Sequence, residues 1–151
     1  MEELWQLEAN IDDMNPQHME YVFDQLFQLG VNDAWAMPMM MKKCRMAVMV
    51  CVLCRESLID AVTKLIFKET TSIGLRYFPV HRVACTRTIR QVAVDEETIH
   101  VKVSSYDGKL TNISAEYDDC RAAAVRTGKP VKYWQRKALE EAYQLYECEF
   151  K

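Results

Sequence analysis

Apolar residues in the first 90 positions switch between strand spacing and helical spacing in a defined order. Helical spacing begins at Asn15 and Pro16, ends at Gly30, and returns over residues 56–67. Extended patterns cover the segments beside and between these helices, which are residues 4–11, 34–40, 46–53 and 73–90. The order strand, helix, strand, strand, helix, strand predicts a ferredoxin-like β-α-β-β-α-β core.

The rest of the chain adds strands and helices to this core. Strand patterns cover residues 86–94 and 98–103, and helical patterns cover residues 116–127 and 132–147. The acidic turn 95–97 joins the two strands, and Asp107-Gly108 predicts a further hairpin turn. We therefore expect an α+β fold. Because the chain has 151 residues, no internal repeat and no clear linker, it is expected to form a single domain over residues 1–151.

Composition and charge argue against several classes of function. The chain has 19 basic and 22 acidic residues and a net charge of -3, which does not suggest a general binder of nucleic acid or of anionic membranes. The longest apolar run, residues 47–54, is far shorter than the ~20 residues of a membrane span. Without a basic-then-apolar leader, the chain is expected to be cytoplasmic and to bind neither nucleic acid nor membrane.

The cysteines are expected to be reduced thiols in that compartment. Their positions are scattered through apolar segments, at residues 44, 51, 54, 85, 120 and 148. Cys51 and Cys54 have the spacing of a metal or redox pair, but a strand places them on opposite sides and no second pair completes a site. We therefore do not predict a metal site at this pair.

The first group of polar residues is Asn10-Ile11-Asp12-Asp13, between a predicted strand and a predicted helix. Adjacent carboxylates are hard oxygen ligands, and they suit the magnesium or manganese that accompanies nucleotide phosphates. The alternative is that these residues cap the helix and interact with its dipole. Both interpretations stay open from the residues alone.

The second group is the basic turn that contains Lys42, Lys43 and Arg45. Three cations within four residues can surround a polyphosphate. Arginine can donate hydrogen bonds to two phosphate oxygens at once, while lysine acts as a point charge. The alternative is a solvated basic turn that protects a strand edge from aggregation. Taken alone, the turn does not decide between them.

The third group lies in residues 67–76 and contains Glu69, Thr70, Thr71 and Arg76. A carboxylate, hydroxyl donors, a glycine and an arginine together can contact a phosphate group. The segment is not a Walker loop, because it lacks the glycine-rich run and its lysine. Its alternative is a helix end that turns into a strand.

In this order the motifs resemble the LarC family, the nickel-pincer cofactor nickel insertases. The matching stretches are N-I-D-D-M-N-P at 10–16, G-V-N-D-A-W-A-M-P-M-M-M-K-K-C-R at 30–45, F-K-E-T-T-S-I-G-L-R at 67–76, the spaced Arg82 and Arg87, and A-E-Y-D-D-C-R at 115–121. The match covers most of the chain. Cys44 and Met46 stand where the family pattern has glycine and proline, and Ala115 replaces a proline. These departures alter the shape of loops without removing their charges.

The resemblance implies that the chain is the nucleotide-binding C-terminal part of a nickel insertase. Such proteins insert nickel into pyridinium-3,5-bisthiocarboxylic acid mononucleotide and consume CTP with manganese, for which magnesium is the alternative. The expected partners are CTP, that mononucleotide and the larger N-terminal part of the family. The chain is therefore expected to be part of a CTP-hydrolysing enzyme that acts together with that N-terminal part.

The resemblance also assigns roles to the three groups. Asp12, Asp13 and Glu69 are expected to be catalytic and to hold the metal, directly or through water. The residues expected to bind the nucleotide are Asn10, Lys42, Lys43, Arg45, Thr70, Thr71 and Arg76. Cleavage of a phosphate bond needs both a divalent cation and positive groups around the phosphates, so the chemistry of the residues agrees with this division.

Two alternatives remain at this point. The chain can be a non-catalytic nucleotide-sensing module, since a ferredoxin-like fold does not by itself determine function. It can also be a module that assembles an oligomer. Half of its residues are hydrophobic, and Trp5, Trp35 and Trp134 are among them. A homo-oligomer is therefore expected in either case.

Overall fold

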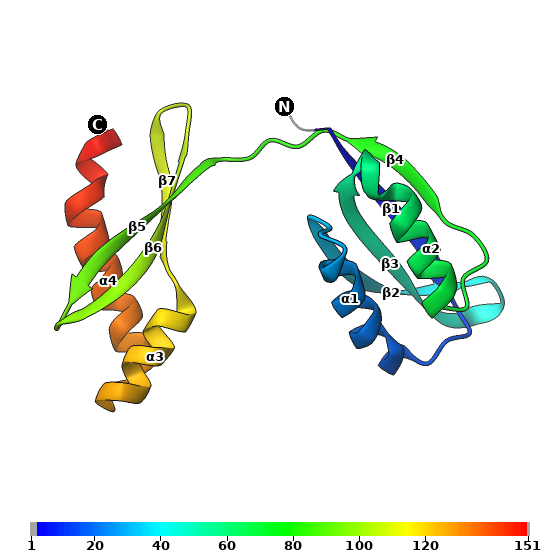
Figure 1. Cartoon of the computed structure of the whole chain (residues 1–151), viewed down its shortest axis with the longest axis horizontal. Helices are drawn as coiled ribbons and strands as arrows, with labels where there is room; N and C mark the ends of the chain where they lie inside the picture. Colours follow the sequence, from blue (N-terminus) through cyan, green and yellow to red (C-terminus); the bar gives the residue numbers. More distant parts are fainter. Residues whose placement is uncertain (1–2, 151) are drawn as a thin grey trace. The chain divides into compact units, whose positions relative to one another are not determined.

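The computed structural model describes residues 3–150, and the chain divides into two compact units, residues 1–82 and 83–151 (Figure 1). Each unit has its own sheet and its own hydrophobic core. The sequence did not indicate two cores. That residues 1–151 behave as one domain stays a prediction, which the number of unfolding transitions tests.

The first unit is the predicted β-α-β-β-α-β core. Its elements are β1 (Leu4–Ile11), α1 (Met19–Gln28), β2 (Asp33–Met41), β3 (Arg45–Arg55), α2 (Ile59–Glu69) and β4 (Arg76–Val80). The sheet order is β2-β3-β1-β4, and every neighbouring pair is antiparallel. This topology confirms the α+β, ferredoxin-like prediction. The first helix begins as predicted, because the side chain of Asn15 accepts a hydrogen bond from Gln17 N at 3.0 Å and Pro16 follows.

Strand alternation separates the core of the first unit from its polar face. Leu7, Ala9 and Ile11 of β1 are buried against the two helices, which contribute Val22, Leu26, Val62 and Ile66. Because successive side chains of a strand point to opposite faces, Glu8 and Asn10 lie on the other face of the sheet. No helix of this core covers that face, so it carries polar side chains towards the end of β1.

The second unit is a three-stranded sheet covered by two helices on one face. Its elements are β5 (Thr86–Val94), β6 (Glu97–Tyr106), β7 (Lys109–Ala115), α3 (Tyr117–Thr127) and α4 (Val131–Tyr146), with the sheet order β5-β6-β7. Its core contains Val92, Ile99, Val101, Cys120 and Trp134. These elements confirm the predicted additional strands and helices.

The extended stretch predicted over residues 73–90 is two strands rather than one. β4 ends at Val80 in the first unit, and β5 begins at Thr86 in the second. The prediction of a continuous stretch was wrong because residues 81–85 contain no glycine or proline to mark a break.

Among the described helices, none has the length and apolar character needed to cross a membrane.

Three of the six cysteines are buried, two of them in the cores. Cys51, Cys54 and Cys120 are buried, and burial is the main cause that raises the pKa of each of these thiols. A raised pKa disfavours the thiolate, which is the form that reacts and binds metal. The buried cysteines therefore act as small apolar residues. The other three, at positions 44, 85 and 148, are exposed.

Asp119 of α3 is expected to make the second unit sensitive to acid. Its Oδ2 accepts hydrogen bonds from the backbone N–H and from ring Nδ1 of His100, both at 2.7 Å. The backbone hydrogen bond is the largest cause that lowers the pKa of Asp119. A carboxyl whose pKa is lower in the folded state stabilises the fold above its unfolded pKa of ~3.9, and this contribution is lost as the pH falls through the folded pKa.

The resulting prediction is a difference in acid sensitivity between the chain and Asp119→Asn. The denaturant midpoint of the unchanged chain should fall between about pH 5 and about pH 2 more steeply than that of the variant, because asparagine cannot titrate. Urea titrations followed by circular dichroism at several pH values measure both slopes. Equal slopes would mean that Asp119 contributes nothing to acid unfolding.

Candidate functional site

Three loops of the first unit meet at one end of its sheet. They are the segment after β1, the turn between β2 and β3, and the connection from α2 to β4 (Figure 1). Each loop carries one of the three groups predicted from the sequence. Asp12 contacts Arg45, which is 33 residues away in the chain, and Asp13 contacts Thr71, which is 58 residues away. The fold therefore brings all three groups together.

The two carboxylates of this site have exchangeable partners. Arg45 Nη1 lies 3.2 Å from Asp12 Oδ2, and the Arg45 side chain is 52% exposed. Thr71 Oγ1 donates to Asp13 Oδ1 at 2.5 Å in an exposed contact. Exposed ion pairs contribute only ~0–1 kcal/mol. Asp12 and Arg45 can therefore separate at little cost, the first towards a cation and the second towards an anion.

The basic turn has an unusual backbone. Lys42–Cys44 form one 3₁₀ turn, in which Lys43 has φ 63° and Cys44 has φ 56°. The left-handed region is unfavourable for residues other than glycine, and backbone strain of this kind is often found at ligand sites. Lys42 and Lys43 are exposed and have no ion-pair partner among residues 3–150. The turn thus presents two unneutralised cations beside Arg45.

The two threonines after α2 have different roles. Thr70 Oγ1 donates to Ile66 O at 2.6 Å and accepts from Ser72 N at 3.1 Å, so its hydroxyl closes the end of the helix. Thr71 instead contacts Asp13 and belongs to the site. The helix-end alternative therefore describes Thr70, while Thr71 joins the first and third groups.

Glu69 lies at a neighbouring pocket. Its Oε1 is 3.0 Å from Lys68 Nζ, and it lines a pocket of about 510 Å³ with Gln17, His18 and Tyr21. That volume is within the range of small-molecule sites. The pocket could not be predicted from the sequence, because its other three residues belong to the start of the first helix and show no pattern of their own.

Arg76 and Asn10 meet on the open face of the sheet. Arg76 Nη2 lies 2.7 Å from Glu8 Oε2 and 3.4 Å from Asn10 Oδ1, and it donates to Met49 Sδ at 3.1 Å. Glu8 is opposite Arg76 in the antiparallel pairing of β1 and β4. Glu8 was not among the predicted site residues, although its two-residue spacing from Asn10 already places the two side chains on one face.

The site offers hard oxygen donors for a divalent cation. Within the described part of the chain, no three or more His, Cys, Asp or Glu residues are arranged to hold a metal. Asp12 and Asp13 do provide two adjacent carboxylates. Magnesium-type ions commonly use one or two protein carboxylates while substrate phosphates and water supply the other ligands. The residues therefore fit an ion that binds together with a nucleotide.

A family comparison decides to which proteins this site belongs. The family model described as nickel insertion protein matches residues 1–134, which include all three groups. The chain belongs to the nickel insertion protein family. This result confirms the resemblance derived from the motifs.

Curated relatives in the family carry a specific name. A pyridinium-3,5-bisthiocarboxylic acid mononucleotide nickel insertion protein of Thermotoga sp. (strain RQ2) is 44% identical over 139 residues, which are 92% of this chain and 35% of that protein. A protein of the same name from Desulfitobacterium hafniense (strain DSM 10664 / DCB-2) is 38% identical over 136 residues, 90% of this chain and 34% of that protein. The chain thus spans about a third of the length of these relatives.

Solved structures agree with the family assignment. The apo form of LarC2, the C-terminal domain of a cyclometallase involved in the synthesis of the NPN cofactor of lactate racemase, has a TM-score of 0.87 and 33% identity. The match covers 93% of this chain and 97% of that one. A protein of Methanopyrus kandleri AV19, with a TM-score of 0.64 and 21% identity over 93% of this chain and 87% of that chain, shares the fold.

The structure also explains two features of the nickel insertion protein motifs. Cys44 occupies a position where the resemblance leads us to expect glycine, and its positive φ is the conformation that glycine adopts without strain. In the run 115–121, Glu116 pairs with Lys102 at 2.6 Å and Asp119 contacts His100. This last motif therefore belongs to the second unit, where it joins α3 to β6.

Proposed function

We propose that this chain is the CTP- and manganese-dependent part of a nickel insertase. It would support the insertion of nickel into pyridinium-3,5-bisthiocarboxylic acid mononucleotide, which yields the nickel-pincer nucleotide. The observation that carries the proposal is the convergence of Asp12, Asp13, Lys43, Arg45 and Thr71 at one end of the first unit. The names of relatives that are about three times longer support the proposal.

The charges at this end of the sheet suit a triphosphate. Lys42 and Lys43 are exposed cations without ion-pair partners among residues 3–150, and Arg45 has a weak, exchangeable one. In the proposed complex, Arg45 forks phosphate oxygens while the lysines neutralise the remaining charge. Arg76 and Asn10 lie on the neighbouring sheet face, and we assign them contacts with the nucleotide. Thr71, in the connection from α2 to β4, would donate a hydrogen bond to it. Thr70 contributes by fixing that connection.

Asp12 and Asp13 would hold the manganese or magnesium ion, and Glu69 would join them directly or through water after leaving Lys68. An ion held there would supply positive charge against the negative charge that develops as a phosphate bond breaks. The residues of the chain supply the rest: they orient the triphosphate, and they keep the carboxylates free for the ion once Arg45 has moved to phosphate. Asp12, Asp13 and Glu69 are accordingly the proposed catalytic residues.

Nickel and its acceptor are the substrates in this proposal. In the pincer product nickel is bonded to sulfur and to carbon, so the acceptor itself supplies the final ligands. The chain would act with the N-terminal part of the family, in the cytoplasm.

We also propose a homo-oligomer, because Met37 and Phe78 are 46% and 40% exposed on the open face of the first sheet. Light scattering at micromolar concentration tests this, and a monomer would contradict it.

Titration calorimetry of the chain with CTP tests the proposal. Binding is expected to be much tighter with manganese than without it and to prefer CTP over ATP as the competing nucleotide. Lys43→Ala should weaken binding about tenfold or more, since a charge-assisted contact contributes ~1.5–3 kcal/mol. Lys64→Ala is the matched control, because Lys64 pairs with Asp60 on α2, away from the three groups.

Turnover separates this proposal from its alternative. CTP cleavage in the presence of the N-terminal part, nickel and the acceptor is expected. Tight CTP binding without cleavage would favour the nucleotide-sensing alternative. A complete absence of CTP binding, with manganese and with the N-terminal part present, would leave only the oligomerisation module.

A further inference from the structure

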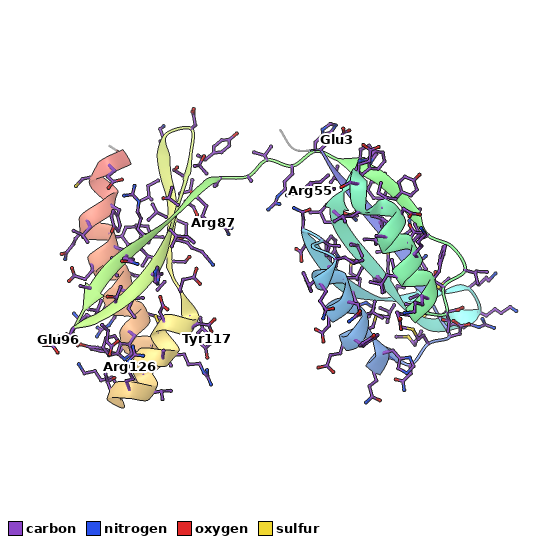
Figure 2. The ribbon with its side chains drawn as sticks, viewed as in Figure 1. Glu3, Arg55, Arg87, Glu96, Tyr117 and Arg126 are labelled. Carbon is purple, nitrogen blue, oxygen red and sulfur yellow. The ribbon has the colours of Figure 1, made fainter. Side chains whose placement is uncertain are left out.

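The second unit carries a polar sheet face that the proposed nucleotide site does not use. The opposite face is buried by α3 and α4 through Val92, Val101 and Ile113. Strand alternation places Gln91 opposite His100, Ile89 opposite Lys102 and Arg87 opposite Ser104 on the open face. Figure 2 labels Arg87 on β5. This face therefore combines an imidazole, two cations and an exposed apolar side chain.

His100 is held in one ring orientation by partners on both sides. Its Nδ1 lies 2.7 Å from Asp119 Oδ2, and its Nε2 lies 2.9 Å from Gln91 Nε2. Because the carboxylate can only accept, Nδ1 carries the proton, and the Gln91 amide N–H donates to the lone pair of Nε2. The lowered pKa of Asp119 keeps this carboxyl ionised. A carboxylate fixes this imidazole, and its basic Nε2 is covered by the exposed Gln91 side chain. This is the arrangement of a general base.

The charged neighbours of His100 are largely paired. Glu116, the residue before α3, pairs with Lys102 of β6 at 2.6 Å, and Arg126 of α3 pairs with Glu97. On β5, Gln91 is the neutral partner, and Arg87 is exposed with no ion-pair or hydrogen-bond partner within residues 3–150. Asp119 is thus the carboxylate in direct contact with the ring, and Arg87 is the unneutralised cation of the face.

We infer that His100 is the base that removes a ring proton when nickel bonds to carbon, and that Asp119 positions it. This inference rests on the proposed function. The pyridinium ring carbon between the two thiocarboxylates carries a hydrogen before insertion. As nickel binds there, the electron pair of the C–H bond becomes the carbon–nickel bond and the proton passes to His100 Nε2. Nickel stays divalent, so the step needs no oxidant or reductant, and Asp119 stabilises the imidazolium that forms.

The same face has a place for the rest of the mononucleotide. Arg87 lies four residues along β5 from Gln91, about 13 Å at ~3.3 Å per residue. A mononucleotide is shorter than this, so the long Arg87 side chain would reach back along the strand to meet the 5′-phosphate. Ile89 lies between them and is 64% exposed. Arg87 would fork the phosphate oxygens while the ring and ribose cover Ile89. Gln91 would leave Nε2 when the ring arrives.

Single-turnover nickel insertion by His100→Gln tests the assignment. The assay combines the chain with the N-terminal part, CTP, manganese, nickel and acceptor that carries either hydrogen or deuterium at the reacting carbon. We expect the variant to form the carbon–nickel bond about 10²–10⁴-fold more slowly, with a clear deuterium effect and without the pH dependence of the unchanged protein. CTP affinity should not change. His81→Gln, an exposed histidine in the 81–85 segment, is the matched control.

Two further variants keep the test decisive if His100→Gln folds poorly. Asp119→Asn retains the imidazole but favours the wrong tautomer, so it should lower the insertion rate and alter its pH profile. Arg87→Ala should raise the acceptor concentration needed for half-maximal rate about tenfold and leave the pH profile intact. Arg90→Ala is the control, because Arg90 pairs with Glu149.

The outcomes also distinguish this inference from the proposed function. If the unchanged protein inserts nickel while folded His100→Gln retains its rate and pH profile, the base assignment is overturned and the proposed function stands. Unchanged rate and profile in Asp119→Asn would overturn the positioning role in the same way. If the unchanged protein neither binds CTP nor inserts nickel, the proposed function fails, and the inference fails with it.

Discussion

Replacing Asp12 by asparagine is expected to weaken manganese-dependent CTP binding about 100-fold, or about 2.7 kcal/mol, while metal-free CTP binding stays equal or becomes tighter. The two effects have opposite signs because Asp12 has two roles. With the ion present it is a proposed ligand. Without the ion it pairs with Arg45 at 3.2 Å and competes with phosphate for that guanidinium. Asparagine removes both the ligand charge and the competitor.

Calorimetry with and without manganese measures both affinities for the same preparation. Asp24→Asn is a matched control. Asp24 is exposed on α1, so this substitution removes one negative charge outside the site. It should change neither affinity by more than the small effect of net charge. An equal loss of CTP affinity with and without the ion in Asp12→Asn would mean that Asp12 supports the turn rather than the metal.

The first unit could be predicted from the sequence because its signals are local. Asn15 and Pro16 start a helix, Gly30 ends it at φ 83°, and the helical spacing of residues 56–67 needs no distant information. The ordering of these elements then selects one common topology. The same topology brings the ends of β1, β2 and α2 to one side, which is why groups chosen for their chemistry meet there.

Contacts that depend on strand register could not be predicted. Glu8 and Arg76 are 68 residues apart, and only the pairing of β1 with β4 sets them side by side. His100 and Asp119 meet because α3 lies beside the part of β6 that β7 does not pair with. The periodicity of the sequence does not indicate this contact. The two cores were missed for a related reason: residues 81–85 have the composition of the strands around them, although β4 and β5 belong to different units.

Trp134→Ala is expected to destabilise the second unit by about 3–5 kcal/mol. Trp134 is fully buried, and its ring packs edge-on against Tyr133 with centroids 5.5 Å apart. Lys129 Nζ lies 5.6 Å from the ring centroid and adds a cation–π contact. A unit of this size has a small core and little stability to lose. Denaturant unfolding followed by circular dichroism measures the loss, and Trp134→Phe, which leaves a smaller cavity, should lose less.

The same variant determines whether the two units depend on each other. Trp5 and Trp35 lie in the first unit and report on it by fluorescence after Trp134 is gone. If the units fold independently, Trp134→Ala unfolds the second one while the first keeps its fluorescence transition and its proposed CTP binding. In that case nickel insertion, which we assign in part to His100, would be lost without loss of nucleotide affinity. A single transition that removes both signals together would instead support one cooperative domain over residues 1–151, because two cores that unfold together share their stability.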